Sequence, residues 1–246
     1  MDTHEMMANW DAWAKSDPMW AILTDPTKKG GQWNPEEFFH SGQAFVDDRM
    51  VWLRQQGINF QPNAKALDFG CGLGRLTQAL GKYFAETHGV DISEEMIKQA
   101  RQLNRMGGRV IYHHNPHHNL QLFAEATFDL IFSFIVLQHI PCRFQKDYLT
   151  DFLRVLKPGG VALFQCVHAL GWRAWLPDEW VDLWRRHRSG GAPIIPMYGL
   201  PKQALAKICT RHGGVIIHDQ AHHSEEVPRF ISVEYLIRKE QKGNLG

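Results

Sequence analysis

The chain has 246 residues, with 27 Lys and Arg against 26 Asp and Glu, so its formal net charge is +1. This balance argues against a general electrostatic grip on nucleic acid or on an anionic membrane. Hydrophobic residues make up 44% and charged residues 22%, as is usual for a globular protein, and no apolar run approaches the ~18 residues of a membrane span. The four cysteines contain no CxxC pair and the N-terminus has no apolar signal segment, so we expect a cytoplasmic protein without disulfides or structural zinc.

Residues 1–63 are rich in Trp, Phe and Pro, which predicts short helices interrupted at prolines. Asn34 is expected to cap a longer helix that has Pro35 in its first position and ends near Gly57. We expect this helical extension to act as a lid on a main domain that covers residues 64–246.

The main domain alternates short apolar runs with helical segments. The expected strands are 64–69, 87–91, 109–114, 128–134, 161–167, 214–219 and 230–238. The expected helices are 74–84, 94–104, 143–156 and about 201–212. Such alternation predicts crossover connections and a mainly parallel sheet covered on both faces. Residues 168–200 interrupt this alternation and are expected to form a Trp-rich insertion after the fifth strand.

A glycine-rich turn follows the first expected strand, with glycines at Gly70, Gly72 and Gly74. In a doubly wound sheet this turn lies at the carboxyl edge, where ligands bind. The dinucleotide fingerprint GxGxxG requires a glycine at the position of Arg75. The carboxylate of Asp68 would sit badly beside a pyrophosphate but suits an ammonium group. The turn therefore predicts a charged nucleoside without phosphates as its ligand.

The end of the second strand carries a further acidic residue, Asp91, twenty-one residues after Gly70. A carboxylate at this place can accept hydrogen bonds from ribose hydroxyls. Ser93 is expected to cap the next helix, with Met96 near the adenine. A plain structural loop is the alternative interpretation of a glycine-rich turn, but the combination with Asp68 and Asp91 favours a nucleoside site.

Four segments of the chain together resemble the class I S-adenosylmethionine-dependent methyltransferases. They are residues 67–74, 89–93, 128–133 with 137–141, and 156–160. Each is a weak signal alone, but they occur in the family's order and spacing over about residues 60–240. The resemblance implies S-adenosyl-L-methionine as cofactor and a doubly wound α/β fold, with a mainly parallel seven-stranded sheet, helices on both faces and an antiparallel last strand.

The resemblance also implies roles for individual residues. Asp91 would hold the ribose hydroxyls, with Ile92 beside the adenine. Where the family often has an acidic residue that accepts from the adenine amino group, this chain has Asn115 or His114. The two residues that end the fourth strand would close the wall beside the sulfonium. The expected cofactor contacts are Asp68, Gly70, Cys71, Gly72, Asp91, Ile92, Met96, His114, Asn115, Ser133, Phe134 and His139.

Methyl transfer from a sulfonium is an in-line displacement, so the protein supplies mainly binding and alignment. An oxygen acceptor usually also loses a proton, which a positioned histidine can take. His139, after the fourth strand, is the first candidate for this base, and its alternative role is packing against the cofactor. His168, after the fifth strand, is a weaker candidate that could equally be a half-exposed loop residue. Tyr198 could enter the pocket from the variable segment.

The histidine-rich, basic and Trp-rich segments of the sequence each have a simple structural interpretation beside a functional one. The histidine-rich run 113–118 and the pair His222–His223 lack the carboxylates of a catechol-orienting metal site, so we expect solvated loops and no metal. The basic run 185–188 is expected to be a solvated helix face, although it could meet an anionic substrate group. The Trp-rich segments could be simple core packing or a lid over an apolar or aromatic acceptor. Their tryptophans are Trp10, Trp13, Trp20, Trp33, Trp172, Trp175, Trp180 and Trp184.

The sequence therefore predicts a methyltransferase that acts on oxygen or nitrogen of a small molecule or short peptide, with neither nucleic acid nor a membrane as partner. An inactive module that only binds S-adenosylmethionine is one alternative, and other sulfonium chemistry on the same fold is another. A nicotinamide-dependent oxidoreductase is a third, opposed by Asp68 and the glycine spacing. The acceptor and the oligomeric state are not determined by the sequence.

Overall fold

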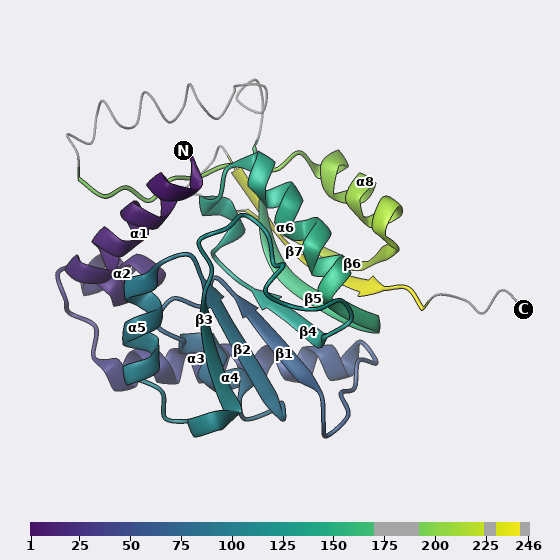
Figure 1. Ribbon diagram of the computed structural model, residues 1–246, viewed down its shortest axis with the longest axis horizontal. Helices are drawn as coiled ribbons and strands as arrows, with labels where there is room; N and C mark the ends of the chain where they lie inside the picture. Colours follow the sequence, from purple (N-terminus) through teal and green to yellow (C-terminus); the bar gives the residue numbers. More distant parts are fainter. Residues whose placement is uncertain (170–191, 224–229, 242–246) are drawn as a thin grey trace, which may run out of the picture. The chain divides into compact units, whose positions relative to one another are not determined.

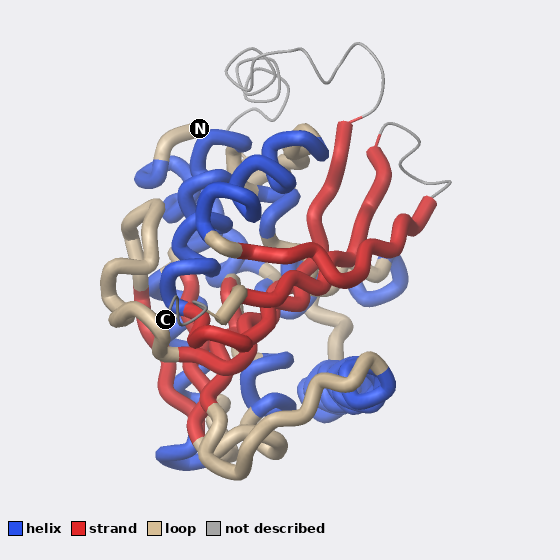
Figure 2. The backbone as a smooth tube through the Cα atoms, turned by 90° about the vertical axis from the view of Figure 1, so that its right-hand side faces the viewer, coloured by secondary structure: helices blue, strands red, loops and turns tan. Residues whose placement is uncertain are grey.

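The structure is a computed structural model that describes residues 1–169, 192–223 and 230–241. The described strands (red in Figure 2) form a seven-stranded sheet in the order β3-β2-β1-β4-β5-β7-β6. Strand β7 is antiparallel to both of its neighbours, which confirms the predicted fold class. Contacts divide the chain into two compact units, Met7–Pro116 and His117–Gly246 with Met1–Met6. This division differs from the predicted boundary at residue 63, which stays a prediction.

The unit Met7–Pro116 contains the N-terminal helices and the first three strands. Its helices are α1 (Thr3–Ser16, which begins in the other unit), α2 (Pro18–Ile22), α3 (Pro35–Gln55), α4 (Arg75–Leu80) and α5 (Glu94–Gln102). Its strands are β1 (Lys65–Phe69), β2 (Glu86–Asp91) and β3 (Val110–His114), and two 3-10 turns lie at Pro26–Lys28 and Gly107–Arg109. The three strands pair in parallel, so their carboxyl ends meet at one edge (Figure 1).

Helix α3 begins and ends close to where the sequence predicts. The Asn34 side chain accepts hydrogen bonds from the backbone N–H groups of Glu36 and Glu37 at 2.8 and 3.3 Å, and Pro35 occupies the first helical position. The helix packs along α4 at Gly42, where an added Cβ would lie 2.6 Å from the carbonyl oxygen of Arg75. This close approach is possible only because residue 42 has no side chain.

Helix α4 is shorter than the predicted 74–84. It ends at Leu80, and the chain continues in a turn in which the Tyr83 N–H donates to the Leu80 carbonyl at 2.8 Å. At Gly81 an added Cβ would meet Val110 at 2.8 Å, so the glycine allows the chain to leave the helix close to β3. The remaining helices in the described part of the chain differ from the predictions only at their ends.

The unit that contains His117–Gly246 holds the second half of the sheet. Its elements are β4 (Phe128–Ser133), a 3-10 turn (Leu137–His139), α6 (Cys142–Val155), β5 (Leu156–Ala169), α8 (Lys202–His212), β6 (Gly214–His223) and β7 (Phe230–Lys239). Strand β5 begins earlier than the predicted residue 161, because Leu156 already pairs with Phe128 before a register shift. Strand β6 extends past the predicted residue 219, because it stays paired with β7 as far as His223.

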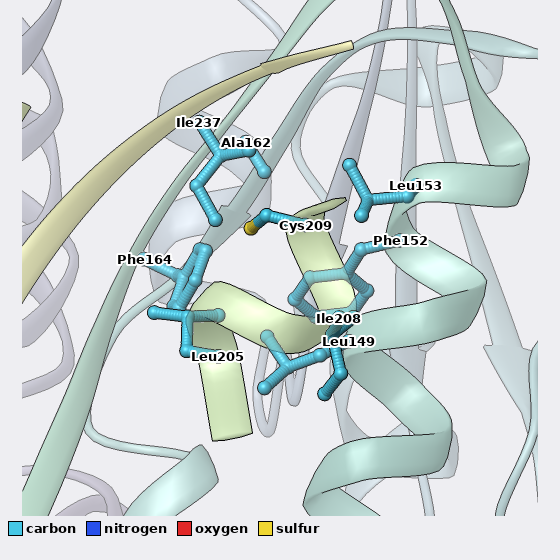
Figure 3. Close-up of a pocket in the computed structure, with 9 residues that line it drawn as sticks. All are labelled: Leu149, Phe152, Leu153, Ala162, Phe164, Leu205, Ile208, Cys209 and Ile237. Carbon is cyan, nitrogen blue, oxygen red and sulfur yellow. The ribbon is translucent and has the colours of Figure 1, made fainter. Parts of the chain in front are cut away.

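Helices α6 and α8 pack against each other (Figure 1). Helix α6 also packs on β5, and α8 packs on β6. A cavity of about 10 Å³ remains between them and the strands (Figure 3). It is lined by Leu149, Phe152, Leu153, Ala162, Phe164, Leu205, Ile208, Cys209 and Ile237. A site this small and this apolar lacks the polar partners that an ordered water needs, so it is a packing gap and not a binding site.

Candidate active site

The glycine-rich turn is held in a conformation that other residues rarely adopt. Gly70, Gly72 and Gly74 have φ values of 74°, 50° and 82°, in the left-handed region that glycine enters without steric penalty. The N–H groups of Gly70 and Cys71 both donate to the carbonyl of Val90, at 2.8 and 3.0 Å. The turn between β1 and α4 is therefore fixed to strand β2.

Asp91 ties this turn to the start of the next helix. One carboxylate oxygen accepts from the Gly72 N–H at 2.8 Å and the other from the Ser93 N–H at 2.9 Å. The Ser93 hydroxyl accepts from the Met96 N–H at 3.1 Å, which confirms that Ser93 caps α5. Burial raises the pKa of Asp91, while its hydrogen bonds oppose the shift. A carboxylate has about four acceptor sites, so Asp91 retains capacity to accept from a hydroxyl group.

Asp68 belongs to strand β1, just before the turn, and its side chain is buried, with only 2% of the residue exposed. It accepts a 2.6 Å hydrogen bond from the Thr77 hydroxyl, and burial raises its pKa to about 7. The thiol of Cys71 is buried nearby, and burial raises its pKa well above the usual value. Cys71 can therefore offer a ligand only its backbone, whereas Asp68 changes charge close to neutral pH.

The residues predicted near the adenine have different environments. Asn115 is buried, and its N–H donates to the Asp91 carbonyl at 2.9 Å. His114 is half-buried, with Nε2 3.2 Å from the carbonyl of Ile92. Met96 is 1% exposed and belongs to the hydrophobic core. Its buried neighbours in that core cluster are Ala14, Phe38 and Leu73. The structure therefore gives Met96 a packing role, and its predicted contact with adenine is not needed to explain it.

The N-terminal helices pack directly on the glycine-rich turn. An added Cβ on Gly72 would lie 2.6 Å from Cδ1 of Ile22 in α2. The Asp11 carboxylate of α1 accepts from the Ser93 hydroxyl at 2.5 Å and from the Glu95 N–H at 3.2 Å. Sequence reasoning missed both residues, because an aspartate and an isoleucine inside short helices carry no motif. Their contacts appear only once the extension is folded.

The described tryptophans of this extension pack and bond locally. Trp13 and Trp20 have ring centroids 5.5 Å apart. The ring N–H of Trp20 donates to the Asp25 carbonyl at 2.9 Å, and that of Trp33 to the Leu23 carbonyl at 3.2 Å. The lid interpretation thus stays a prediction. The predicted roles of Trp172, Trp175, Trp180, Trp184 and the basic run 185–188 lie outside the described residues.

In the other unit, His139 has a defined tautomer. Its Nδ1 lies 2.6 Å from the Pro196 carbonyl, and because a carbonyl only accepts, Nδ1 carries the proton. Its Nε2 lies 3.3 Å from the side-chain amide nitrogen of Gln138 and is left as the acceptor. Tyr198 belongs to the same arrangement, since its N–H donates to the Gln138 carbonyl at 2.7 Å. This tautomer presents the lone pair that a general base needs.

His168, the weaker candidate, is held at both ring nitrogens. Nδ1 bonds to the carbonyl of Leu200, and Nε2 lies 2.7 Å from the Tyr235 hydroxyl. Since Nδ1 donates to the carbonyl, Tyr235 donates to Nε2. Burial lowers the pKa of His168, which keeps it neutral. This arrangement favours a structural role that joins β5, β7 and the chain before α8.

The two predicted wall residues lie at the carboxyl end of β4 in the same unit, with Ser133 as its last residue and Phe134 directly after it. Ser133 is fully buried, and Phe134 is half-buried with its ring centroid 4.7 Å from that of Phe132. Their position beside a sulfonium stays a prediction.

The histidine-rich segments do not form a metal centre in the part of the chain that the structure describes, where no group of three or more His, Cys, Asp or Glu converges. His113 instead shares a 2.8 Å hydrogen bond with His88, and His222 is exposed. Across the described ranges, no helix combines the length and apolar character needed to cross a bilayer.

Comparison with known proteins agrees with this geometry. Residues 67–164 match the family model described as a methyltransferase domain. The ubiquinone biosynthesis O-methyltransferase of Bordetella avium (strain 197N) is 27% identical over 137 residues, which cover 55% of this chain and 56% of that protein. Squalene methyltransferase 1 of Botryococcus braunii is 34% identical over 107 residues, 42% of this chain and 28% of that protein. The chain thus spans about half the length of the ubiquinone biosynthesis relative, and less of the other.

Among solved structures, magnesium protoporphyrin IX methyltransferase from Synechocystis PCC 6803 with bound S-adenosylhomocysteine has a TM-score of 0.63. It is 19% identical and the match covers 97% of this chain and 100% of that one, so it shows a shared fold. Together with the strand order, these findings show that residues 67–164 are similar to a methyltransferase domain and that the chain shares its fold with a methyltransferase solved with S-adenosylhomocysteine. The same Synechocystis methyltransferase has also been solved with bound S-adenosylmethionine.

Proposed function

We propose that this protein transfers a methyl group from S-adenosylmethionine to an oxygen of a small-molecule acceptor. The observation that carries the proposal is the turn at Gly70–Gly74, whose backbone is pinned to β2 and to the Asp91 carboxylate. An oxygen acceptor is favoured over nitrogen because the ubiquinone biosynthesis relatives are named O-methyltransferases. The charge balance of the chain supports a small acceptor over nucleic acid, and we include a cytoplasmic location in the same proposal.

Residues of the unit Met7–Pro116 would bind the cofactor. The remaining acceptor sites of Asp91 would take the ribose hydroxyls, as the family pattern implies. Asp68, once ionised, would attract the positive charge on the methionine part of the cofactor. Asn115 and His114 lie at the end of β3, whose residue His114 pairs with Asp91 of β2, and the proposal keeps them as candidates for the adenine. The cofactor supplies the electrophilic methyl carbon.

His139 would serve as the general base. Its Nε2 lone pair takes the proton of the acceptor hydroxyl as that oxygen forms its bond to the methyl carbon. The cofactor would release the methyl carbon and keep the electron pair of the carbon–sulfur bond, which would leave S-adenosylhomocysteine as the product. The Pro196 carbonyl holds Nδ1–H throughout and stabilises the imidazolium that forms. Ser133 and Phe134 would line the methyl-transfer end of the site.

A module that only binds the cofactor is the second candidate. It is favoured by one contact, the 3.3 Å approach of the Gln138 amide to His139 Nε2, because a base must be free of this donor to act. The two candidates differ in turnover and not in affinity for the cofactor.

The test compares the wild type with His139→Gln. S-adenosylhomocysteine release is followed with catechol and 4-alkylcatechols as trial acceptors, and affinity for S-adenosylhomocysteine is measured by calorimetry. We expect kcat to fall by about 10²–10⁴-fold in the variant with affinity unchanged. Equal turnover in both proteins would remove His139 as the base. Tight cofactor binding without turnover in the wild type would instead support the binding module.

A further inference from the structure

Ile135 has a backbone conformation that is costly for its side chain. In the described part of the chain, Ile135 and Ala126 are the non-glycine residues with positive φ, at 61° and 52°. The left-handed region is a genuine outlier for a β-branched residue, because Cβ and its two substituents crowd the backbone. Such a conformation persists only where the surroundings enforce it.

Two neighbouring strands enforce it here. The Ile135 N–H donates to the side-chain oxygen of Gln165 in β5 at 3.1 Å. The amide nitrogen of Gln165 donates to the Ser232 hydroxyl in β7 at 2.5 Å, which fixes which end of the amide faces Ile135. This chain of hydrogen bonds holds the residue that follows strand β4 in its strained form.

The strained residue presents an apolar side chain to solvent. Ile135 is 37% exposed, whereas Phe132 and Leu137 on either side are fully buried. Its exposure and its conformation both work against stability, since more than a third of its surface gains nothing from the core. Backbone strain of this kind clusters at functional sites. Ile135 lies two residues after Ser133 and four before His139, between two residues with proposed catalytic-site roles.

We propose that Ile135 is a specificity-determining residue that contacts the apolar skeleton of the acceptor. The proposal rests on the proposed function and adds a substrate class to it, a hydroxyl-bearing acceptor with an aliphatic substituent. Binding of such an acceptor covers the exposed isoleucine, so that the hydrophobic gain missing in the free protein is realised in the complex. Gln165 acts as a positioning residue, because it holds the backbone that aims Ile135.

Val215 in strand β6 provides a matched control. It is also β-branched and apolar, and is 42% exposed, but its backbone is that of a regular strand paired with Arg238. Asparagine tolerates the left-handed region and is poor in strands. The change to asparagine should therefore have opposite effects at the two positions, with Ile135→Asn raising the thermal midpoint by about 2–4 °C and Val215→Asn lowering it.

The binding experiment is calorimetry with 4-hexylcatechol on protein saturated with S-adenosylhomocysteine. We expect Ile135→Asn to weaken 4-hexylcatechol binding about three- to fivefold, which is the loss expected when the exposed third of an isoleucine is no longer there to be covered. Ile135→Met keeps an apolar side chain and should retain most of the affinity. Val215→Asn should leave it unchanged, and all variants should bind S-adenosylhomocysteine as the wild type does.

Two results would overturn the inference while the cofactor part of the proposed function survives. One is equal 4-hexylcatechol affinity in the wild type and Ile135→Asn. The other is a wild type that binds S-adenosylhomocysteine but none of the alkylcatechols. A wild type that fails to bind S-adenosylhomocysteine would instead overturn the proposed function itself, and this inference with it.

Discussion

Asp68, in the unit Met7–Pro116, is a carboxyl group whose charge changes near physiological pH. Its carboxyl is buried, bonded to Thr77, and has a pKa raised to about 7 because burial disfavours the charged form. The same carboxyl distinguishes the predicted ligands, since its anion attracts an ammonium or sulfonium group and repels a diphosphate.

This placement predicts a pH-dependent affinity. Below pH 7 Asp68 is mostly protonated and gives no attraction, so affinity for S-adenosylmethionine should rise as the pH is raised from about 6 to 8. Calorimetry in buffers of different ionisation enthalpy should show proton release on binding near pH 7. Asp68→Asn should bind more weakly at pH 8 and lose most of the pH dependence. An equally steep profile in that variant would assign the dependence to another group.

Single residues differ in how well the sequence predicts them. The glycine spacing, Asp91 and the Ser93 cap are local patterns of backbone conformation, and the structure shows the expected turn and cap. Ile135 could not be predicted, because its conformation depends on Gln165 from a strand that lies thirty residues further along the chain. Met96 has the periodicity of a helix face, which does not distinguish a core contact from a ligand contact.

At the scale of elements, the crossing of α3 and α4 depends on one glycine. Gly42→Ala would bring Cβ to 2.6 Å from the backbone carbonyl of Arg75, which cannot move like a side-chain end. We expect the free energy of unfolding to fall by about 1–3 kcal/mol, as in other overpacked sites. Gly108→Ala is the matched control, because nothing lies within 4 Å of its added Cβ. Urea denaturation of both variants measures the difference, and equal midpoints would contradict the packing argument.

The contact of α1 with the start of α5 predicts an effect on cofactor binding. Asp11→Ala removes the acceptor of Ser93 Oγ and Glu95 N–H, next to the Asp91 carboxylate. Affinity for S-adenosylhomocysteine should fall by about 0.5–2 kcal/mol, the range of a lost cap. Asp2→Ala also removes an aspartate that accepts from a helix N–H, that of Glu5 in α1, and should leave the affinity unchanged. Equal loss in both variants would show that α1 acts only through its stability.

The ends of the helices and strands differ in how well the sequence predicts them. Helix α3 was predictable because Asn34, Pro35 and the first-turn acids define its start. The end of α4 at Leu80 and the extension of β6 to His223 were not, since they depend on packing against β3 and on pairing with β7. Termini of elements are set by tertiary contacts more than by local preference.

At the scale of the whole molecule, a series of side-chain hydrogen bonds makes the free energy of unfolding depend on pH. Glu86 bonds to both Lys65 and His88, and His88 bonds to His113, which joins the first three strands. Burial, together with the neighbouring His88 and Arg101, lowers the pKa of His113 to about 4. The unfolded chain therefore binds more protons than the folded one between about pH 4 and 6.5.

The free energy of unfolding should accordingly fall as the pH is lowered from about 6.5 towards 4. Because His113 is half-buried, solvent screening limits its share to about 1 kcal/mol or less. Urea midpoints between pH 7.5 and 4.5 should drop less steeply in His113→Gln, which does not titrate, than in the wild type. If the urea midpoints of the two proteins fell equally with pH, the His88–His113 pair would not contribute to acid sensitivity.

The fold of the whole molecule was the most predictable level. Strand and helix alternation predicts a parallel sheet, and the four motif segments carry the resemblance to S-adenosylmethionine-dependent methyltransferases. The division into Met7–Pro116 and the remainder was not predictable, because it follows the contacts of the folded chain, such as those of α3 with α4, and not its composition.

The central claim is that the Gly70–Gly74 turn and Asp91 bind an amino-acid nucleoside. Calorimetric titration of the wild type and of Asp91→Ala with S-adenosylhomocysteine, and of the wild type with a nicotinamide dinucleotide, tests it most directly. We predict saturable binding of S-adenosylhomocysteine, weakened by about 1–3 kcal/mol in Asp91→Ala, and none of the dinucleotide. Binding of the dinucleotide by folded protein that gives no heat with S-adenosylhomocysteine would contradict the account.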